Sequence, residues 1–179
     1  MIAGRRLAAC FACALVLLVG GCATTAEPRG LSDLSGRLAL RVDVPEAARS
    51  FSADFDLRGD AARGSLRLTG PLGAMLAQAR WQPGAAELTT SDSGVRVFDD
   101  LDQLAQALLG ESLPMAALID WLRGRPWPGA ASVAAGSGFD QLGWTVDLAR
   151  YAEGVLSATR AARGGQAGVS VRVRLDRAS

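Results

Sequence analysis

The most regular stretch of the 179-residue sequence lies near its C-terminus and reads Val169-Ser170-Val171-Arg172-Val173-Arg174-Leu175-Asp176. Every second side chain is apolar, and the side chains between are polar. In a β-strand this alternation places all the apolar side chains on one face. A strand with one face toward a core and the other toward water is typical of an antiparallel sheet. This segment therefore predicts the class of the fold.

The same alternation recurs across the first half of the chain. Residues 38–44 and 51–58 alternate over their whole lengths, and 63–68 do so after the turn pair Gly59-Asp60. Shorter strands are expected at 75–81, 86–90, 95–98, 143–148 and, with the weakest pattern, 155–158. Gly164 and Gly165 suit a turn before the last strand. These segments together predict an antiparallel meander with one apolar face.

Between the two groups of strands, the spacing of apolar side chains changes to that of a helix. Apolar residues recur at three- and four-residue intervals over 101–108, which places them on one helix face. Either Asp99 or Asp100 can cap the start, and Gly110 follows the last periodic residue. A second short helix is expected to begin at Ser112.

This second helix carries Pro114 in its first turn and is expected to end at Gly124. Its inward face should hold Met115, Leu118, Trp121 and Leu122.

Strands, two helices and then strands predict a mainly β fold with some α: a curved antiparallel sheet whose concave apolar face is covered by the helices. An uncovered apolar face of that size would promote aggregation. The helices can form a permanent cover of the core, or a lid that lifts to admit an apolar ligand. The pattern alone does not distinguish these alternatives.

The N-terminus has the three parts of a secretory signal. Arg5 and Arg6 precede the apolar run 7–19, which has the length of a signal-peptide core and is short for a permanent membrane span. The run ends at Val19-Gly20-Gly21-Cys22, which resembles a lipobox, the motif whose cysteine becomes acylated. We therefore expect residues 1–21 to be removed and Cys22 to carry the lipid anchor. An ordinary secretory signal with an incidental cysteine is the alternative.

The remaining chain is expected to comprise an acylated N-terminus and linker at 22–33, with Pro28 and Gly30, and a single domain at 34–179. Two of the three cysteines, Cys10 and Cys13, lie in the predicted signal, so no disulfide is expected in the domain.

Composition argues against several functional classes. The chain has no His and no Lys, which removes His-dependent triads, Schiff-base chemistry and most zinc sites. Its 19 basic and 18 acidic residues leave no basic surface for nucleic acid. The acidic cluster Asp99, Asp100 and Asp102 precedes a predicted helix, where acids stabilise the helix dipole rather than form a catalytic pair. We expect a protein that is not an enzyme and has no metal or other cofactor.

Several motifs together resemble the LolB family of outer-membrane lipoprotein receptors. In chain order they are Ser35-Gly36-Arg37-Leu38-Ala39-Leu40, then Gly70-Pro71-Leu72-Gly73, then Leu113-Pro114 with Leu118, Trp121-Leu122 and Gly124, and then Phe139-Asp140-Gln141-Leu142-Gly143-Trp144 with Tyr151. The similarity covers residues 35–176, which is nearly the whole predicted domain.

The resemblance implies an incomplete β-barrel of the LolA/LolB type, closed by short helices, whose cavity accepts lipoprotein acyl chains. A LolA-like periplasmic carrier would deliver the cargo, and the protein would insert it into outer-membrane lipid. The chain would be an outer-membrane lipoprotein facing the periplasm, and we expect a monomer. Ala23 fits this location, because by analogy with enteric bacteria an aspartate there would favour retention in the inner membrane. Expected cavity or lid residues are Leu118, Trp121, Leu122 and Trp144.

Leu72 is a separate candidate. Gly70, Pro71 and Gly73 make a tight turn around it, and a leucine at a turn tip costs free energy if it stays in water. It can fold back onto its own sheet, or it can project toward a membrane. The resemblance implies the second role, in membrane insertion and cargo transfer.

Other functions are compatible with the pattern. One is a carrier or sensor for another apolar ligand, and another is a structural lipoprotein of an envelope assembly whose helices merely fill the sheet.

Overall fold

The computed structural model describes residues 33–44 and 48–176, so the predicted signal peptide, Cys22 and most of the linker lie outside the described residues. Eleven strands form one sheet: β1 (Leu34–Asp43), β2 (Arg49–Gly59), β3 (Gly64–Thr69), β4 (Met75–Gln82), β5 (Ala85–Thr90), β6 (Gly94–Phe98), β7 (Ser132–Ala135), β8 (Gly138–Gln141), β9 (Trp144–Asp147), β10 (Val155–Arg160) and β11 (Gly168–Leu175). Between β6 and β7 come the helices α1 (Leu101–Leu109) and α2 (Met115–Trp121), and a 3₁₀ turn, η1 (Tyr151–Glu153), precedes β10.

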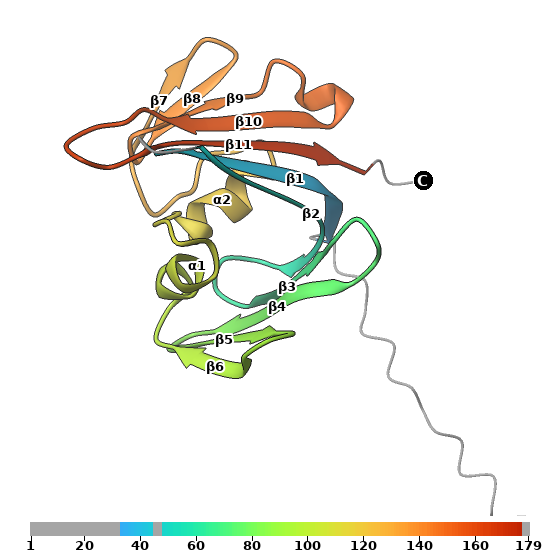
Figure 1. Cartoon of the computed structure of the whole chain (residues 1–179). Helices are drawn as coiled ribbons and strands as arrows, with labels where there is room; N and C mark the ends of the chain where they lie inside the picture. The colour runs from blue at the N-terminus through green and yellow to red at the C-terminus, as the bar shows by residue number, and fades with distance from the viewer. Residues whose placement is uncertain (1–32, 45–47, 177–179) are drawn as a thin grey trace, which may run out of the picture.

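The sheet is antiparallel throughout and remains open. Its strand order is β6-β5-β4-β3-β2-β1-β11-β10-β9-β8-β7, so β1 pairs with β11 in the middle and the two edges are β6 and β7. The helices lie in the connection between these two edges, inside the curve of the sheet (Figure 1). The structure confirms the predicted architecture of an incomplete barrel closed by short helices.

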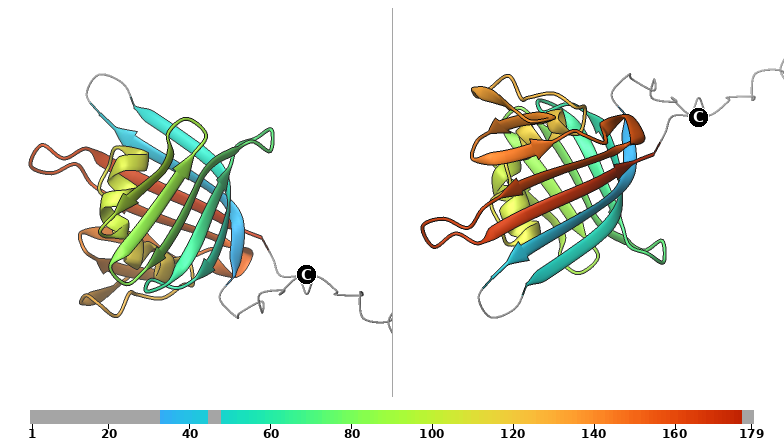
Figure 2. Two further views of the ribbon diagram at one scale, coloured as in Figure 1. Left: turned by 90° about the horizontal axis from the view of Figure 1, so that it is seen from below. Right: turned by 90° about the horizontal axis from the view of Figure 1, so that it is seen from above.

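Alternation along the strands separates a buried inner face from an exposed outer face. In β2, Ala53, Phe55 and Leu57 are buried, whereas Asp56 and Arg58 between and beside them are exposed. The same separation holds along β4, β9 and β11. Figure 2 shows the sheet wrapping around the two helices from both sides. The core therefore lies between the concave face of the sheet and the helices.

The predicted ends of α1 are confirmed. Asp100 is the N-cap, and its carboxylate accepts a 2.8 Å hydrogen bond from the backbone N–H of Gln103. Gly110 ends the helix in the left-handed conformation at φ 73°, which glycine adopts without strain. The N-cap is thus the second of the two candidates, Asp99 and Asp100.

The expected start of the second helix was wrong. Helix α2 begins at Met115, not at Ser112, because Pro114 has ψ 81° and occupies the N-cap position. Residues 111–114 instead form the link between the two helices.

The region 132–148 also differs from the expectation. The strands β7 and β8 were not predicted, since β7 is short and mostly exposed. Leu142, just before the strand expected at 143–148, lies in the turn after β8 at φ 53° and is 46% exposed. None of the helices in residues 33–44 and 48–176 is long and apolar enough to cross a membrane.

Candidate functional site: an apolar cavity beneath two helices

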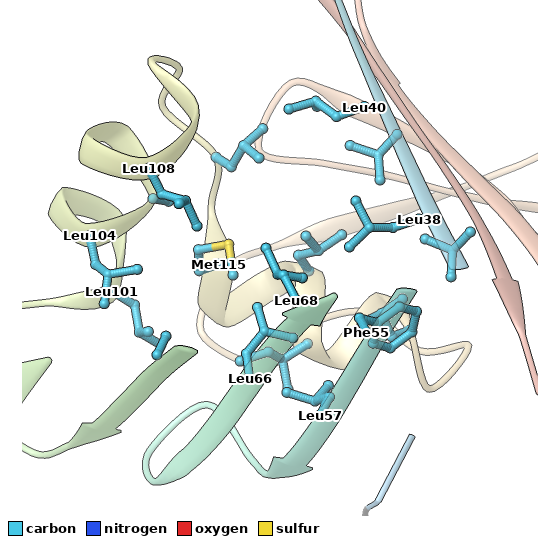
Figure 3. Close-up of a pocket in the computed structure, with 18 of the residues that line it drawn as sticks. Leu38, Leu40, Phe55, Leu57, Leu66, Leu68, Leu101, Leu104, Leu108 and Met115 are labelled. Carbon is cyan, nitrogen blue, oxygen red and sulfur yellow. The ribbon is translucent and has the colours of Figure 1, made fainter. Parts of the chain in front are cut away.

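A cavity of about 70 Å³ lies between the helices and the concave face of the sheet. Helix α1 contributes Leu101, Leu104, Ala105 and Leu108, which are the residues at helical spacing in the sequence. In Figure 3 the leucines of α1 point across the gap toward Leu66 and Leu68 of β3. Every side chain that lines the cavity is apolar: Leu38, Leu40, Phe51, Phe55, Leu57, Leu66, Leu68, Ala79, Trp81, Leu101, Leu104, Ala105, Leu108, Leu113, Met115, Leu118, Ile119, Leu122, Val171 and Val173.

The volume is small for such an extensive lining. Pockets that enclose drug-sized ligands usually measure about 300–1,000 Å³. A cavity of 70 Å³ has space for a short piece of an acyl chain only. Since the walls carry no polar side chain, a longer apolar ligand would meet a chemically uniform surface once the helices moved outward.

The link between the helices is attached to the sheet by charged side chains. Glu111 lies between Arg49 of β2, at 3.3 Å, and Arg160 of β10, at 3.8 Å. Arg160 also donates to the carbonyl of Ser112 at 3.2 Å, and its guanidinium lies 5.4 Å from the ring centre of Trp144. One link segment thus contacts strands on both sides of β1 and β11. Arg49 is largely exposed, so water weakens its part of this attachment.

Helix α1 has few polar contacts besides this link. The Asp102 carboxylate accepts a 3.1 Å hydrogen bond from the backbone N–H of Met115, which joins α1 to the start of α2. The rest of its attachment is the apolar packing of its inner face.

The C-terminal end of α2 is held by a buried network. Trp121 donates through its indole Nε1 to Oε1 of Gln141 at 2.8 Å, and Gln141 is only 2% exposed. The same amide bonds the backbone N–H and C=O of Trp127 and the C=O of Ala130, at 2.7–2.9 Å. Both ends of the amide are therefore satisfied, and the loop after α2 is fixed to β8.

Further bonds reinforce the same end of α2. Asp120 is buried and pairs with Arg125 at 2.7 Å, and Arg123 donates to the carbonyl of Gly59. The hydroxyl of Tyr151 donates to the carbonyl of Leu122 at 3.0 Å, and burial raises the pKa of Tyr151 above its usual value. A tyrosine hydroxyl is protonated at neutral pH, so this one can donate. Helix α2 is thus fixed by one buried and several partly buried polar contacts, whereas α1 has fewer.

The four predicted cavity residues separate into two groups. Leu118 and Leu122 line the cavity, together with the unpredicted residues of β1, β2, β3 and α1. Trp121 and Trp144 do not line it. Their rings pack against each other at 5.9 Å, and Trp121 contacts Phe139 edge to face at 6.4 Å. Trp121 of α2 and Trp144 of β9 thus pack together on the side of α2 that contacts Gln141.

Leu72 stands at the tip of the β3–β4 hairpin and is 98% exposed, so it does not fold back onto its own sheet. The turn is closed by hydrogen bonds from Gly70 N–H to Ala74 at 2.8 Å and from Gly73 N–H to Gly70 at 2.9 Å. Gly73 adopts φ 78°, Pro71 is exposed, and Gly70 is buried beneath the tip. The 70–74 loop and the end of β11 lie at the same end of the molecule in all views (Figures 1 and 2).

Comparison with known proteins gives a consistent result. The family described as "Outer membrane lipoprotein LolB" matches residues 32–176. The chain is 34% identical to the outer-membrane lipoprotein LolB of Bordetella petrii, over 82% of this chain and 80% of that protein. It is 31% identical to the protein of that name from Chromobacterium violaceum, over 78% of this chain and 81% of that protein. It is 33% identical to the protein of that name from Thiobacillus denitrificans, over 82% of this chain and 84% of that protein.

Proposed function

The chain belongs to the LolB family of outer-membrane lipoproteins, and from this premise we propose that it accepts lipoproteins from a periplasmic carrier and inserts them into the outer membrane. The carrier would be LolA-like, and the cargo would be recognised through its acyl chains. The protein would be anchored at the outer membrane, face the periplasm and act as a monomer.

The observation that carries this proposal is the wholly apolar cavity between α1, α2 and the sheet. Each buried CH₂ of an acyl chain gains about 0.8 kcal/mol, so a site that buries more of the chain draws cargo from one that buries less. The sequence has no GxxxxGK[ST] motif for coupling to a nucleotide. Transfer would follow differences in affinity.

Cargo entry requires the cavity to enlarge, and we assign this motion to α1. Its attachments are the apolar packing, one bond to Met115 and the contacts of Glu111. Helix α2 would remain as a fixed wall because Gln141 and Tyr151 bind its C-terminal end. The two helices would then differ in role: α1 acts as the lid, and α2 acts as its support.

Two membrane contacts complete the proposal. An acylated Cys22 would tether the domain through residues 23–33, a stretch that reaches at most about 40 Å when extended. Leu72 would enter the bilayer surface, helped by its exposure and by the partly exposed Met75 in the same hairpin. Because β1 begins at the end of the molecule that carries the 70–74 loop, one orientation satisfies both contacts (Figure 1). Residues 1–21 would be the removed signal and 34–179 the single cargo-binding domain.

A structural lipoprotein is the alternative, and the small volume of the cavity favours it. In that case the helices would fill the sheet permanently, and no cargo would enter. Cargo transfer from a loaded carrier distinguishes a lipoprotein acceptor from a structural lipoprotein. A carrier loaded with a lipoprotein is mixed with this protein, and cargo crosslinked to each is followed over time. We expect cargo to leave the carrier and to appear on this protein, whereas a structural lipoprotein would acquire none.

A further inference from the structure

A compact group of five charged side chains and one serine occupies the outer face of the sheet where β1 begins and β11 ends. Strand register aligns them in two rows across β2, β1 and β11, and we call them the charged grid. The row nearer the strand ends consists of Asp56, Ser35 and Asp176, and the next row consists of Asp54, Arg37 and Arg174. Successive outward residues of a strand are about 7 Å apart, and neighbouring strands are about 4.8 Å apart.

A surface hollow of about 470 Å³ lies over this grid. All six side chains of the charged grid line it, together with Gly36 and Phe55 between the rows. This volume is within the range of pockets that hold small ligands. The hollow lies on the outer face, whereas the acyl cavity lies on the inner face, and Phe55 is the one residue that lines both.

The guanidinium groups in the hollow are not equivalent. Arg37 makes a forked bond to Asp54, at 2.8 and 3.3 Å, and this bond lowers the pKa of the Asp54 carboxyl. Arg174 is directly opposite Arg37 on β11, and no carboxylate partner for it is found within the described part of the chain. Like charges directly opposite on neighbouring strands destabilise a sheet. An anionic group bound at Arg174 would relieve this repulsion.

The carboxylates in the hollow also differ in whether they have a partner. Asp176 accepts a 2.8 Å hydrogen bond from the hydroxyl of Ser35, whereas Asp56 has no cationic partner among the described residues. The hollow thus combines a guanidinium on β11 with an available carboxylate on β2, one row away and two strands across. The hollow contains two arginines and three aspartates. A simple anion would therefore pair only with an arginine, and a simple cation only with an aspartate.

The location of the hollow indicates the source of the ligand. It lies at the beginning of β1, where the chain enters the domain, and at the end of the molecule that carries Leu72 (Figures 1 and 2). Thr69, the residue before the turn that carries Leu72, pairs with Asp54 of the charged grid. In the orientation proposed above, lipid headgroups would therefore lie beside the hollow.

We propose that this hollow binds the headgroup of a zwitterionic phospholipid, with the phosphate at Arg174 and a primary ammonium at Asp56. Carboxylates accept hydrogen bonds from the N–H groups of ethanolamine, whereas the trimethylated nitrogen of choline cannot donate any. The site therefore selects phosphoethanolamine over phosphocholine. The inference rests on the proposed membrane function for its lipid source, but binding of the headgroup can be measured independently of cargo transfer.

The test is a titration of the full acylated protein, in nonionic detergent, with soluble glycerophosphoethanolamine, followed by backbone amide NMR. We expect saturable shifts at 35–37, 54–56 and 174–176, and at least fivefold weaker binding of glycerophosphocholine, inorganic phosphate and ethanolamine. Arg174→Gln and Asp56→Asn should each weaken binding about three- to tenfold. The controls are Arg172→Gln and Glu87→Gln, which change exposed outward charges outside the hollow.

Probe selectivity and delivery into vesicles distinguish the possible results. Equal binding of all four probes, or shifts outside these residues, would overturn the headgroup site and indicate an adventitious ion only. The protein should deliver more cargo into vesicles of phosphatidylethanolamine than into vesicles of phosphatidylcholine. Arg174→Gln should abolish this difference. Arg174→Gln should still accept cargo from the carrier, which also reports correct folding. If the wild type accepted no cargo, the proposed function would fail, but the titration would still decide the headgroup site.

Discussion

The indole Nε1 of Trp121 donates a 2.8 Å hydrogen bond to the side chain of Gln141, and both residues are almost fully buried. This bond joins the end of α2 to β8, and the remaining polar atoms of Gln141 fix the loop that follows α2. Helix α2 is therefore bonded to the sheet by a buried side-chain pair, whereas α1 is held by apolar packing and a charged link.

Replacement of this amide should destabilise the domain. Gln141→Leu has similar bulk but leaves the Trp121 indole and three backbone groups without partners, and each unsatisfied buried group costs about 1–3 kcal/mol. We expect a loss of at least about 4 kcal/mol in the free energy of unfolding, measured by urea denaturation. Gln82→Leu, at an exposed position of β4, should change it by less than about 0.5 kcal/mol. A loss no greater than that of the control would show that the network does not fix α2.

Loss of the charge at Glu111 should release the lid. Glu111→Gln removes the ion pairs with Arg49 and Arg160, which at this partly exposed site contribute about 0.5–1 kcal/mol. If these contacts hold the closed state, a fluorescent fatty acid should enter about two- to fivefold faster in stopped-flow measurements. Glu153→Gln removes an exposed pair with Arg150 on η1 and serves as the control. Unchanged entry rates would exclude the link as a determinant of opening.

The cavity itself can be filled from α1. Ala105 is buried and lines the cavity, so Ala105→Leu should place its added carbons in existing space and change stability by less than about 1.5 kcal/mol. The affinity for a fatty-acid probe should fall at least fivefold. Ala77→Leu, at a buried position away from the cavity, should instead overpack the core and cost about 1–3 kcal/mol. Fatty-acid affinity that survives Ala105→Leu would show that the ligand binds elsewhere.

The exposed tip of the β3–β4 hairpin should matter only at the membrane. Leu72→Glu should leave stability within about 0.5 kcal/mol, because the side chain has no packing to lose. Cargo acceptance from the carrier should be unchanged, and delivery into vesicles should fall at least tenfold. Val133→Glu changes an equally apolar, 69% exposed side chain on β7 and should deliver cargo normally. Normal delivery by Leu72→Glu would show that the hairpin tip has no role in cargo delivery.

The sequence predicts the sheet well because alternation is a local property of each strand. Strands β1, β2 and β11 carry long apolar faces, and the caps of α1 follow from Asp100 and Gly110. Strand β7 has only four residues and is mostly exposed, so it carries no such signal.

The composition of the cavity was harder to predict. Leu118 and Trp121 are one turn apart on α2 and both lie inward, yet Leu118 lines the cavity and Trp121 packs behind the helix against Trp144. Helical periodicity identifies the inward face but does not show which inward residues border a gap between two layers. The polar partner that draws Trp121 away, Gln141, lies twenty residues further along the chain and has no local signature.

The most direct test of the central claim locates the cargo acyl chain on the protein. A lipoprotein that carries a photoactivatable group in its acyl chain is passed from the loaded carrier to this protein, irradiated, and mapped by mass spectrometry. We predict labelled peptides from α1, from Leu118 and Leu122 of the α2 region, and from Leu66 and Leu68 of β3, all of which line the cavity. Labels confined to the outer face of the sheet or to the edge strands β6 and β7 would contradict the account.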